Sequence, residues 1–285
     1  MYPIVEKTDL PGGVFRYRVC APEIARKAAP GQFVILRVDD HGERIPITIA
    51  DADPEGGTLL FYVQAVGVTT LRMSRLKTGD RLRDLAGPLG LSSPIEPVGR
   101  VVAVGGGFGI AALYPIVKAH VQTGNAVTVL LGARTRQLIL METEMRRLTP
   151  DVLLVTDDGS VGRQGLVTDA LAPLLETNPP DLVIAIGPLI MMKAVSDLTR
   201  PAGVATRVSL NPIMVDGTGM CGACRVNING RLKFACVDGP EFDGHQVDFD
   251  SLLNRLQAYK EEEQEALKRI RRELETDCPL GTGKP

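Results

Sequence analysis

Three cysteines and one aspartate lie close together in the stretch MVDGTGMCGACRVNINGRLKFAC, at residues 214–236. Cys221 and Cys224 form a C-x2-C pair, Cys236 follows, and Asp216 stands five positions before Cys221. With a cysteine in place of Asp216, the spacing would be the C-x4-C-x2-C…C pattern of plant-type [2Fe-2S] proteins. The segment therefore predicts a [2Fe-2S] cluster in which Asp216 is the fourth ligand, an oxygen donor among thiolates.

Glycines separate these ligands, at Gly217, Gly219 and Gly222. A loop that wraps an inorganic cluster must turn tightly and point backbone N–H groups at the sulfides, which glycine permits without steric cost. A structural zinc site is the competing interpretation, with the three cysteines joined by Asp216 or by His245. Inert buried thiols are a third interpretation, which explains the density of glycine and cysteine least well.

The other two of the five cysteines lie far from this segment. Cys20 ends an expected strand and is assigned to the core, whereas Cys278 falls in a loose C-terminal tail and is given no role. A chain of 285 residues can bury a core without cross-links, and its first residues lack the basic start and apolar run of a secretory leader. We therefore expect a cytoplasmic protein, in which clustered cysteines bind metal or act as redox groups.

The overall composition excludes two classes of partner. A formal net charge of −2 gives no basic field, so no nucleic-acid partner is expected. The most apolar stretch, residues 182–192, contains Pro188 and is far shorter than the roughly 20 residues that cross a bilayer. No membrane span is expected.

Residues 1–98 read as short strands punctuated by glycine and proline. The expected strands contain VFRYRVC, GQFVILRV, RIPITIA and TLLFYVQAV, with turn signals between them. This spacing predicts a small antiparallel barrel or sandwich.

Residues 99–210 have a different texture, in which continuous Val, Ile and Leu runs alternate with helical segments. RVVAVGGG, AVTVLLGAR, DVLLVTDD and DLVIAIGP are the expected strands. Strands this apolar are typical of a parallel sheet covered by helices on both faces.

Three loops at the carboxyl edge of that sheet are candidates for a nucleotide site. The first is a glycine-rich turn with Gly106, Gly107 and Gly109, followed by a helix that begins near Ile110. Such a turn lets a diphosphate approach the backbone at a helix start, although the spacing departs from G-x-G-x-x-G and a purely structural turn remains open. The other two loops place Asp157 and Asp158, and Gly187 and Pro188, after later strands of the same sheet.

Two further anion-binding features lie in the N-terminal region. Arg44 and Thr48 are four apart on an expected strand and so share one face, where they could meet a phosphate and ring oxygens or simply lie at the surface. Gly67, Thr69 and Thr70 precede a helical stretch.

The cysteine segment forms a third module at residues 211–250, and residues 251–285 form a charged helix and tail. The helical pattern runs continuously through FDSLLNRLQAYKEEEQEALKRIRRELE. Its charges either face solvent or dock a partner subunit.

In the order RIPIT, VGVTTLRMSRLKTGD, GPLG, GGGFGIAAL, DDGSVGRQGLVTD, GPLIMMKAV and D-x4-C-x2-C-x11-C, the sequence resembles the ferredoxin reductase-like flavoproteins. Within them it is similar to the small subunits of NADH-dependent reduced ferredoxin:NADP oxidoreductase, also described as sulfide dehydrogenase beta-like subunits. The electron-transfer subunit of dihydroorotate dehydrogenase B is a close relative. The resemblance covers about residues 1–250, and LNPIMVDGTGMCGACRV is its most specific part.

The resemblance implies an α/β plus β fold, with an FAD-binding β-barrel domain, an NAD(P)-binding parallel-sheet domain, a [2Fe-2S] module and a terminal helix. It implies FAD contacts from Arg44, Pro46, Ile47, Thr48, Val66, Gly67, Thr69 and Thr70. It implies NAD(H) contacts from Gly106, Gly107, Gly109, Gly187 and Pro188, and cluster ligation by Asp216, Cys221, Cys224 and Cys236. Asp157 and Asp158 are cofactor-binding candidates from their place after a strand of the same sheet. Pro46 stands where the wider superfamily usually has tyrosine, and Ala112 where it usually has proline.

The implied function is electron transfer between NAD(H), FAD and the cluster inside an electron-bifurcating complex. The implied partner is a larger flavin and iron–sulfur subunit that resembles the glutamate synthase small subunit, with ferredoxin reached through the complex. NADP(H) stays open, because Arg134 and Arg136 could meet a 2′-phosphate or face solvent. The alternatives are the dihydroorotate dehydrogenase B subunit and, from another class, a non-catalytic zinc-binding scaffold.

Overall fold

The N-terminal region of the protein folds into two antiparallel sheets that share one core. The structure is a computed structural model that describes residues 1–276. The larger sheet has the order β5-β6-β2-β1-β7 and the smaller has the order β4-β3-β8. Their strands are β1 (Tyr2–Leu10), β2 (Val14–Cys20), β3 (Phe33–Arg37), β4 (Ile45–Thr48), β5 (Asp51–Asp53), β6 (Thr58–Gln64), β7 (Arg81–Leu82) and β8 (Asp84–Leu89).

Alternation of side chains along these strands builds the core between the two sheets. Tyr17 and Val19 of β2 are fully buried, as are Val34 and Leu36 of β3. The Tyr17 hydroxyl donates to the backbone carbonyl of Met73 at 2.5 Å and so holds helix α2 (Val68–Ser74) beneath the sheets. The result is the expected barrel-like antiparallel domain, which also contains a short helix, α1 (Pro22–Ala25).

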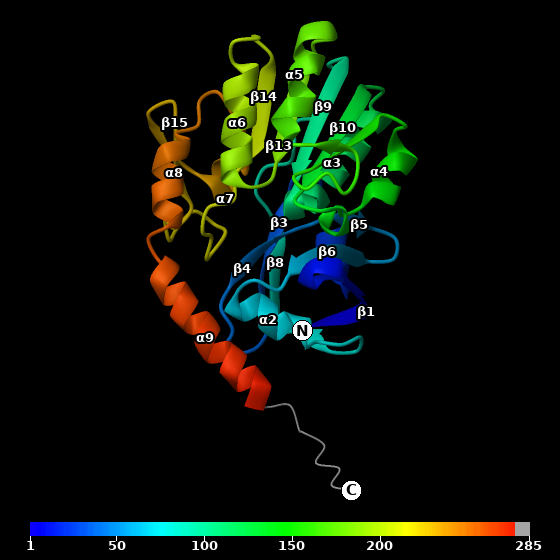
Figure 1. Cartoon of the computed structure of the whole chain (residues 1–285). Coiled ribbons are helices and arrows are strands. Elements are labelled where there is room, and N and C mark those ends of the chain that lie inside the picture. Colours follow the sequence, from blue (N-terminus) through cyan, green and yellow to red (C-terminus); the bar gives the residue numbers. More distant parts are fainter. Residues whose placement is uncertain (277–285) are drawn as a thin grey trace, which may run out of the picture.

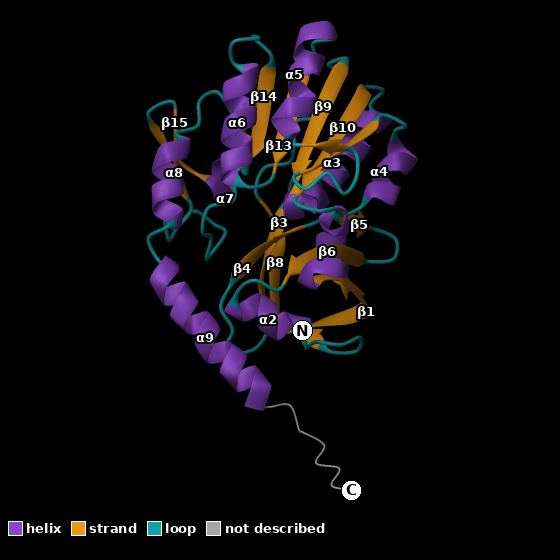
Figure 2. Ribbon diagram, viewed as in Figure 1, coloured by secondary structure: helices purple, strands orange, loops and turns teal. Residues whose placement is uncertain are grey.

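A sheet of seven strands forms the second region, in the order β12-β11-β10-β9-β13-β14-β17. All pairings in it are parallel except that of β17 with β14. The strands are β9 (Arg100–Gly106), β10 (Ala126–Ala133), β11 (Val152–Thr156), β12 (Arg163–Gln164), β13 (Leu182–Ile186), β14 (Ala205–Ser209) and β17 (Glu241–Asp243). Helices α3 (Ile110–Gln122) and α4 (Glu142–Leu148) cover one face, and α5 (Val167–Thr177) and α6 (Leu189–Thr199) cover the other (Figure 2).

Buried β-strands explain the continuous apolar runs in this region. Along β9, Val101 and Ala103 pack with α3 and α4, whereas Val102 and Val104 pack with α5 and α6. Because successive side chains point to opposite faces, a sheet covered on both faces needs an apolar residue at every position. The expected parallel sheet is confirmed.

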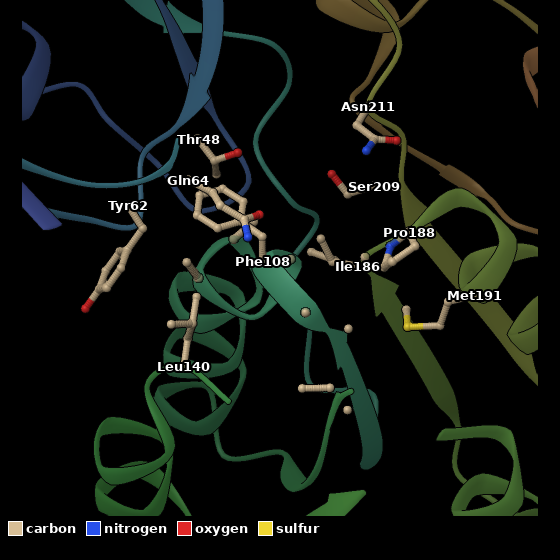
Figure 3. A pocket seen from close by; sticks show the side chains of 18 of the residues that line it. Thr48, Tyr62, Gln64, Phe108, Leu140, Ile186, Pro188, Met191, Ser209 and Asn211 are labelled. Atoms are coloured by element: carbon tan, nitrogen blue, oxygen red, sulfur yellow. The ribbon is translucent and has the colours of Figure 1, made fainter. Parts of the chain in front are cut away.

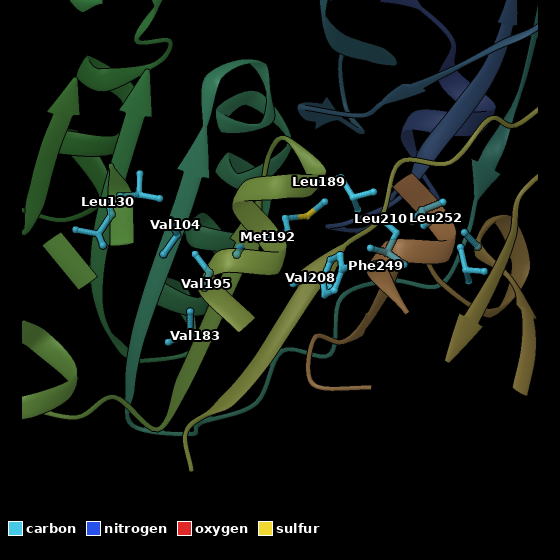
Figure 4. Close-up of a cluster of buried hydrophobic side chains, with 14 of the residues drawn as sticks. Val104, Leu130, Val183, Leu189, Met192, Val195, Val208, Leu210, Phe249 and Leu252 are labelled. Carbon is cyan, nitrogen blue, oxygen red and sulfur yellow. The ribbon is translucent and has the colours of Figure 1, made fainter. Parts of the chain in front are cut away.

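The cysteine segment shares the hydrophobic core of this sheet and does not form a core of its own. It contains the hairpin of β15 (Arg225–Ile228) and β16 (Arg231–Phe234), the short helix α7 (Ala235–Asp238) and then β17. Cys224 and Cys236 belong to the same buried cluster as Val208 of β14 and as Phe249 and Leu252 of the following helix. Figure 4 shows Val208, Phe249 and Leu252 within this cluster.

The charged C-terminal pattern is two helices in the structure, and the single continuous helix expected from the sequence is wrong. Helix α8 (Phe249–Leu256) packs on α6 and β15, and α9 (Lys260–Thr276) begins after a turn. In Figure 1, α9 descends from the cysteine module to the barrel, where it meets α2. Ile270 of α9 is buried and Arg75 donates to the Leu274 carbonyl, so this helix makes contacts within the chain.

The expected domain boundaries fall at different kinds of position. Residues 98 and 99 lie between β8 and β9, and residues 210 and 211 lie just after β14. The third expected boundary, at residues 250 and 251, lies inside α8. Within residues 1–276, no helix has the length and apolar character needed to span a membrane.

Candidate functional site

A cavity of about 960 Å³ lies between the barrel-like domain and the carboxyl edge of the parallel sheet. Its wall combines β4 and β6 of the barrel, the turns after β9 and β13, the loop after β11, and the segment that follows β14. This volume is at the upper end of that of small-molecule sites, and most of the lining is apolar. Figure 3 shows side chains from both regions pointing into this space.

The barrel side of the wall contains three of the residues expected at a flavin. Pro46, Ile47 and Thr48 of β4 line the cavity, whereas Arg44 precedes the strand, is exposed and is not part of the wall. Gln64 from the end of β6 lines it too, a position that no sequence motif indicated.

The expected residues around α2 lie outside the cavity wall, namely Val66, Gly67, Thr69 and Thr70. The Thr70 hydroxyl accepts hydrogen bonds from the backbone N–H groups of Val66 and Gly67, at 3.0 and 2.8 Å, and so closes the turn that starts this short helix. Thr69 is buried. The structure therefore gives Thr70 a capping role, and any contact of this turn with a diphosphate stays a prediction.

The glycines in the turn after β9 are needed because this turn packs directly against the turn after β13. A methyl group on Gly106 would lie 2.3 Å from Met191 Sδ, and one on Gly109 would lie 2.5 Å from the Ile186 carbonyl oxygen. Gly107 differs, because its φ is +52° and nothing lies within 4 Å of the place a methyl would take. Gly106 and Gly109 therefore serve the packing of the two turns, whereas the backbone at Gly107 can be approached closely from the cavity.

The neighbouring loops bring more of the expected residues to the cavity. Asp157, Gly187 and Pro188 line it. Asp158 does not, because its carboxylate accepts from the backbone N–H and the hydroxyl of Ser160, and these hydrogen bonds hold its pKa below the usual range.

The two arginines after β10 have different surroundings. Arg134 lines the cavity, whereas Arg136 is bound to Glu142, which also accepts from Arg146 at 2.9 Å. Arg136 is therefore neutralised by its own neighbour, and Arg134 and Asp157 are the charged groups of opposite sign in the wall.

Sequence reasoning missed the segment that joins the cavity to the cysteine loop. Ser209, Leu210, Asn211, Pro212 and Met214 line the cavity just before Asp216, and Pro240 lines it four positions after Cys236. The side chain of Phe108, 38% exposed, also reaches the cavity (Figure 3). The signal available in the sequence was the largely apolar run LNPIM at residues 210–214, directly before Asp216.

The wall fits a flavin and a nicotinamide nucleotide on its own features. A bulky ring system requires apolar walls, to which Pro46 and Ile47 of β4 and Leu210 and Met214 after β14 contribute. A diphosphate requires approachable backbone, which Gly107 supplies at the start of α3.

The four expected cluster ligands form two pairs. Cys224 and Cys236 are buried, with their sulfurs 3.2 Å apart. Asp216 and Cys221 form the other pair, because the Cys221 backbone N–H donates to Asp216 Oδ2 at 2.8 Å. Cys221 is exposed, so this pair faces solvent.

Electrostatics differ between the two pairs. Backbone hydrogen bonds from Thr218 and Cys221 lower the pKa of Asp216, which keeps its carboxylate charged. Burial and the adjacent Cys224 thiol raise the pKa of Cys236 to about 12, while the backbone N–H of Gly219 acts in the opposite direction.

This arrangement fits two bridged irons better than one metal ion. Among residues 1–276, no three His, Cys, Asp or Glu side chains converge to hold a single ion. A [2Fe-2S] cluster instead takes two protein ligands on each of its irons, and two pairs of donors match that demand. The ring of His245, the alternative zinc ligand, lies 3.0 Å from the Thr199 hydroxyl of α6.

A seam of hydrogen bonds ties the linker after β8 to the strands beside the cysteine loop. The Leu91 N–H donates to the Gly239 carbonyl at 2.7 Å, the Ser93 hydroxyl donates to Glu241, and Arg207 donates to the Pro94 carbonyl at 2.6 Å. The other carboxylate oxygen of Glu241, Oε2, is buried and has no hydrogen-bond partner within the described chain. Burial raises the pKa of Glu241, against the opposing effects of Ser93 and of the Arg207 charge.

This raised pKa predicts a pH-dependent stability. Above the ordinary value of 4.5, the folded state holds the Glu241 proton more strongly than the unfolded chain, so this carboxyl's contribution to the free energy of unfolding falls as pH rises toward its folded pKa. Glu241→Gln removes that loss, and we expect the free energy of unfolding of the variant to rise relative to that of the wild type as pH increases from 5 to 8. Urea unfolding across this range checks it, with Glu55→Gln in an exposed turn as control. Parallel profiles for Glu241→Gln and wild type would contradict the assignment.

Comparison with known proteins matches two parts of the chain to family models. Residues 211–248 match the iron–sulfur cluster binding domain of dihydroorotate dehydrogenase B, and residues 103–197 match the oxidoreductase NAD-binding domain.

Whole-chain relatives agree with these matches. A Thermotoga maritima protein described as a homologue of the dihydroorotate dehydrogenase B (NAD(+)) electron transfer subunit is 51% identical over 94% of each chain. The subunit of that name from Desulforamulus reducens is 37% identical over 80% of this chain and 89% of its own. A chain solved in work on flavin-based electron bifurcation, in the structure of NADH-dependent reduced ferredoxin-NADP oxidoreductase, has 48% identity and a TM-score of 0.90 over 95% of this chain and 98% of its own.

Proposed function

The chain belongs to the family of dihydroorotate dehydrogenase B electron-transfer subunits and their homologues, and from this premise we propose that it works in a ferredoxin:NAD(P) oxidoreductase complex. It is an electron-transfer subunit of a flavoprotein oxidoreductase, with a ferredoxin reductase-like fold and FAD, NAD(H) and an iron–sulfur cluster as its redox groups.

One observation carries the proposal. The cavity wall includes five of the six residues 209–214, which lie just before Asp216, and Pro240, which follows Cys236 by four positions. A flavin ring in this cavity would therefore adjoin the backbone that carries the cluster ligands. Short separation between two redox groups is what an electron-transfer subunit must provide.

The proposed division of labour follows the walls of the cavity. Pro46, Ile47 and Thr48 hold the flavin ring, the turn at Gly106, Gly107 and Gly109 holds the nucleotide diphosphate, and Gly187 and Pro188 support the nicotinamide. A flavin held there would supply the chemistry that joins a two-electron nicotinamide donor to a one-electron cluster. The chain's own residues orient the two rings and exclude water from the apolar slot.

The nucleotide is proposed to be NAD(H). Asp157 is a carboxylate in the wall and Arg136 is already bound to Glu142, so only Arg134 would face the extra charge of a 2′-phosphate. The hydroxyls of an NAD(H) ribose, by contrast, can donate to Asp157.

The proposed partner is a larger flavin and iron–sulfur subunit through which ferredoxin is reached. The likeness at 48% identity and a TM-score of 0.90 to a chain of the NADH-dependent reduced ferredoxin-NADP oxidoreductase supports this type of complex. The names of the sequence relatives favour a second candidate, the dihydroorotate dehydrogenase B complex. Copurification of the large subunit decides between them. In a ferredoxin-NADP oxidoreductase complex it would be an electron-bifurcating flavoprotein, and in a dihydroorotate dehydrogenase B complex it would oxidise dihydroorotate.

The experiment that tests the function uses protein purified without oxygen. We expect FAD, two irons and two acid-labile sulfides per chain, and rapid bleaching of the flavin band when NADH is mixed with it. NADPH should react much more slowly. Protein that contains zinc without iron or sulfide would contradict the proposal and favour the zinc-binding scaffold.

A further inference from the structure

Helix α8 reaches the cluster loop from outside the segment that matches the cluster-binding family model. That match ends at residue 248, and α8 (Phe249–Leu256) begins at the next residue. The Arg255 side chain of α8 donates to the Ala223 backbone carbonyl at 3.2 Å. Ala223 lies between Cys221 and Cys224, so a cation from the C-terminal region holds the middle of the C-x2-C loop.

Helix α8 is firmly anchored, so the position of this guanidinium is defined. Phe249 and Leu252 are 5% and 2% exposed and belong to the buried cluster that also contains Cys224. Asp248 caps the helix by accepting the Ser251 N–H at 3.0 Å. The resulting contacts with α6 and β15 fix α8 on both the sheet and the hairpin.

Within the described chain, Arg255 is half-buried and makes no ion pair with a carboxylate. A surface arginine commonly pairs with a neighbouring acid, which would cancel its field. The positive charge of Arg255 is therefore not cancelled by a carboxylate of the described chain and can act on the cysteine loop. Arg225, which directly follows Cys224, is exposed, and its Nη1 lies 3.9 Å from the place that a methyl on Gly222 would take.

The hydrogen bond also fixes the direction of a peptide group. In a trans peptide the C=O and the N–H point in opposite directions, so a carbonyl of Ala223 held toward α8 turns the Cys224 N–H away from α8. Backbone N–H groups that point at cluster sulfurs stabilise the added negative charge of the reduced state.

On the basis of the proposed function, we propose that Arg255 is a positioning residue for the cluster. It holds the C-x2-C loop from α8 and favours the reduced cluster through its uncompensated positive charge. Reduction adds one electron and one negative charge to the cluster, and the nearby cation stabilises that charge without a proton transfer. The cluster site therefore extends beyond the segment of the family model to the C-terminal helix.

Three substitutions separate charge from hydrogen bonding. Arg255→Lys keeps the charge, Arg255→Gln keeps a hydrogen-bond donor without charge, and Arg255→Met removes both. Arg271→Met, on the exposed side of α9, is the control for loss of a surface cation. Each full-length protein is prepared with its cofactors and titrated with a reductant while the EPR signal of the reduced cluster is followed.

We expect the reduced-to-oxidised ratio of the cluster, at one fixed ambient potential, to fall about fivefold in Arg255→Met. Arg255→Gln should fall by less than Arg255→Met, and Arg255→Lys and Arg271→Met should stay near wild type. Loss of the cluster in Arg255→Met, with Arg255→Lys intact, also supports the role. Equal midpoint potentials in wild type and in all three Arg255 variants would overturn it.

Failure of the proposed function gives a different result. Wild-type protein without iron, acid-labile sulfide or an EPR signal would contradict the electron-transfer function itself. An intact wild-type cluster with potentials that do not respond to Arg255 would contradict only the inference about α8.

Discussion

Cys236→Ala is expected to abolish the iron–sulfur cluster while the flavin stays reducible by NADH. Cys236 is 1% exposed and its sulfur lies 3.2 Å from that of Cys224, so these two thiols form the buried pair of the proposed ligand set. Alanine leaves one iron with a single protein ligand in an apolar setting where water cannot substitute for the thiolate. We expect iron and acid-labile sulfide to fall at least tenfold, and electron transfer to a one-electron acceptor to fall with them.

The cavity should be spared in this variant because Cys236 is not part of its wall. Flavin content and the rate of flavin bleaching by NADH in a stopped-flow mixing experiment therefore serve as the internal reference. Cys20→Ser is the matched control, since Cys20 is a half-buried thiol at the end of β2, far from the loop in sequence. Full iron content in Cys236→Ala would remove Cys236 from the ligand set.

Asp216→Cys gives the contrasting result within the same set. A thiolate at this position completes a four-cysteine pattern, so the variant should keep a [2Fe-2S] spectrum with a shifted potential. Redox and EPR behaviour identical to wild type would mean that Asp216 only braces the loop, through its hydrogen bonds with Thr218 and Cys221.

The sequence was informative wherever one periodicity or one spacing decided the structure. Uninterrupted Val, Ile and Leu runs predicted the parallel strands because both faces of that sheet are buried, as β9 shows with Val101 and Val102 on opposite sides. Strand β1 was missed, since YPIVEKTDL mixes charged and apolar residues and its pairing with β2 contains a register shift near Ile4. Helices α8 and α9 merged in the pattern because the turn between them, residues 257–259 (QAY), contains no glycine or proline that would mark a helix end.

The candidate site was predictable in its types of residue and less so in its assembly. Glycines after β9 pointed to close backbone approach, yet the structure assigns Gly109 to contact with the turn after β13, which no local pattern can indicate. Residues 209–214 entered the cavity wall because β14 ends there, at the junction of two domains. Arg255 reaches the cysteine loop through tertiary packing alone, 32 residues along the chain from Ala223.

Gly109→Ala is expected to be the most damaging single-methyl change in the nucleotide region. Its backbone is helical, at φ −62° and ψ −16°, so alanine suffers no conformational strain there. The added methyl would lie 2.5 Å from the Ile186 carbonyl oxygen and 2.7 Å from the Gly187 Cα. Both are backbone atoms at the end of a buried strand, so the two turns must separate, at a cost of about 3 kcal/mol in the free energy of unfolding.

Separation of these turns moves both halves of the proposed nicotinamide site, so flavin reduction by NADH should slow more than tenfold even in protein that remains folded. Gly203→Ala is the control, because its φ is +67° but the methyl would meet nothing within 4 Å. That variant carries only the left-handed strain of about 1 kcal/mol and should reduce its flavin at the wild-type rate. Urea unfolding and stopped-flow mixing measure the two effects separately. If Gly109→Ala and Gly203→Ala lose equal stability and react equally fast, the contact between the two turns does not hold the site together.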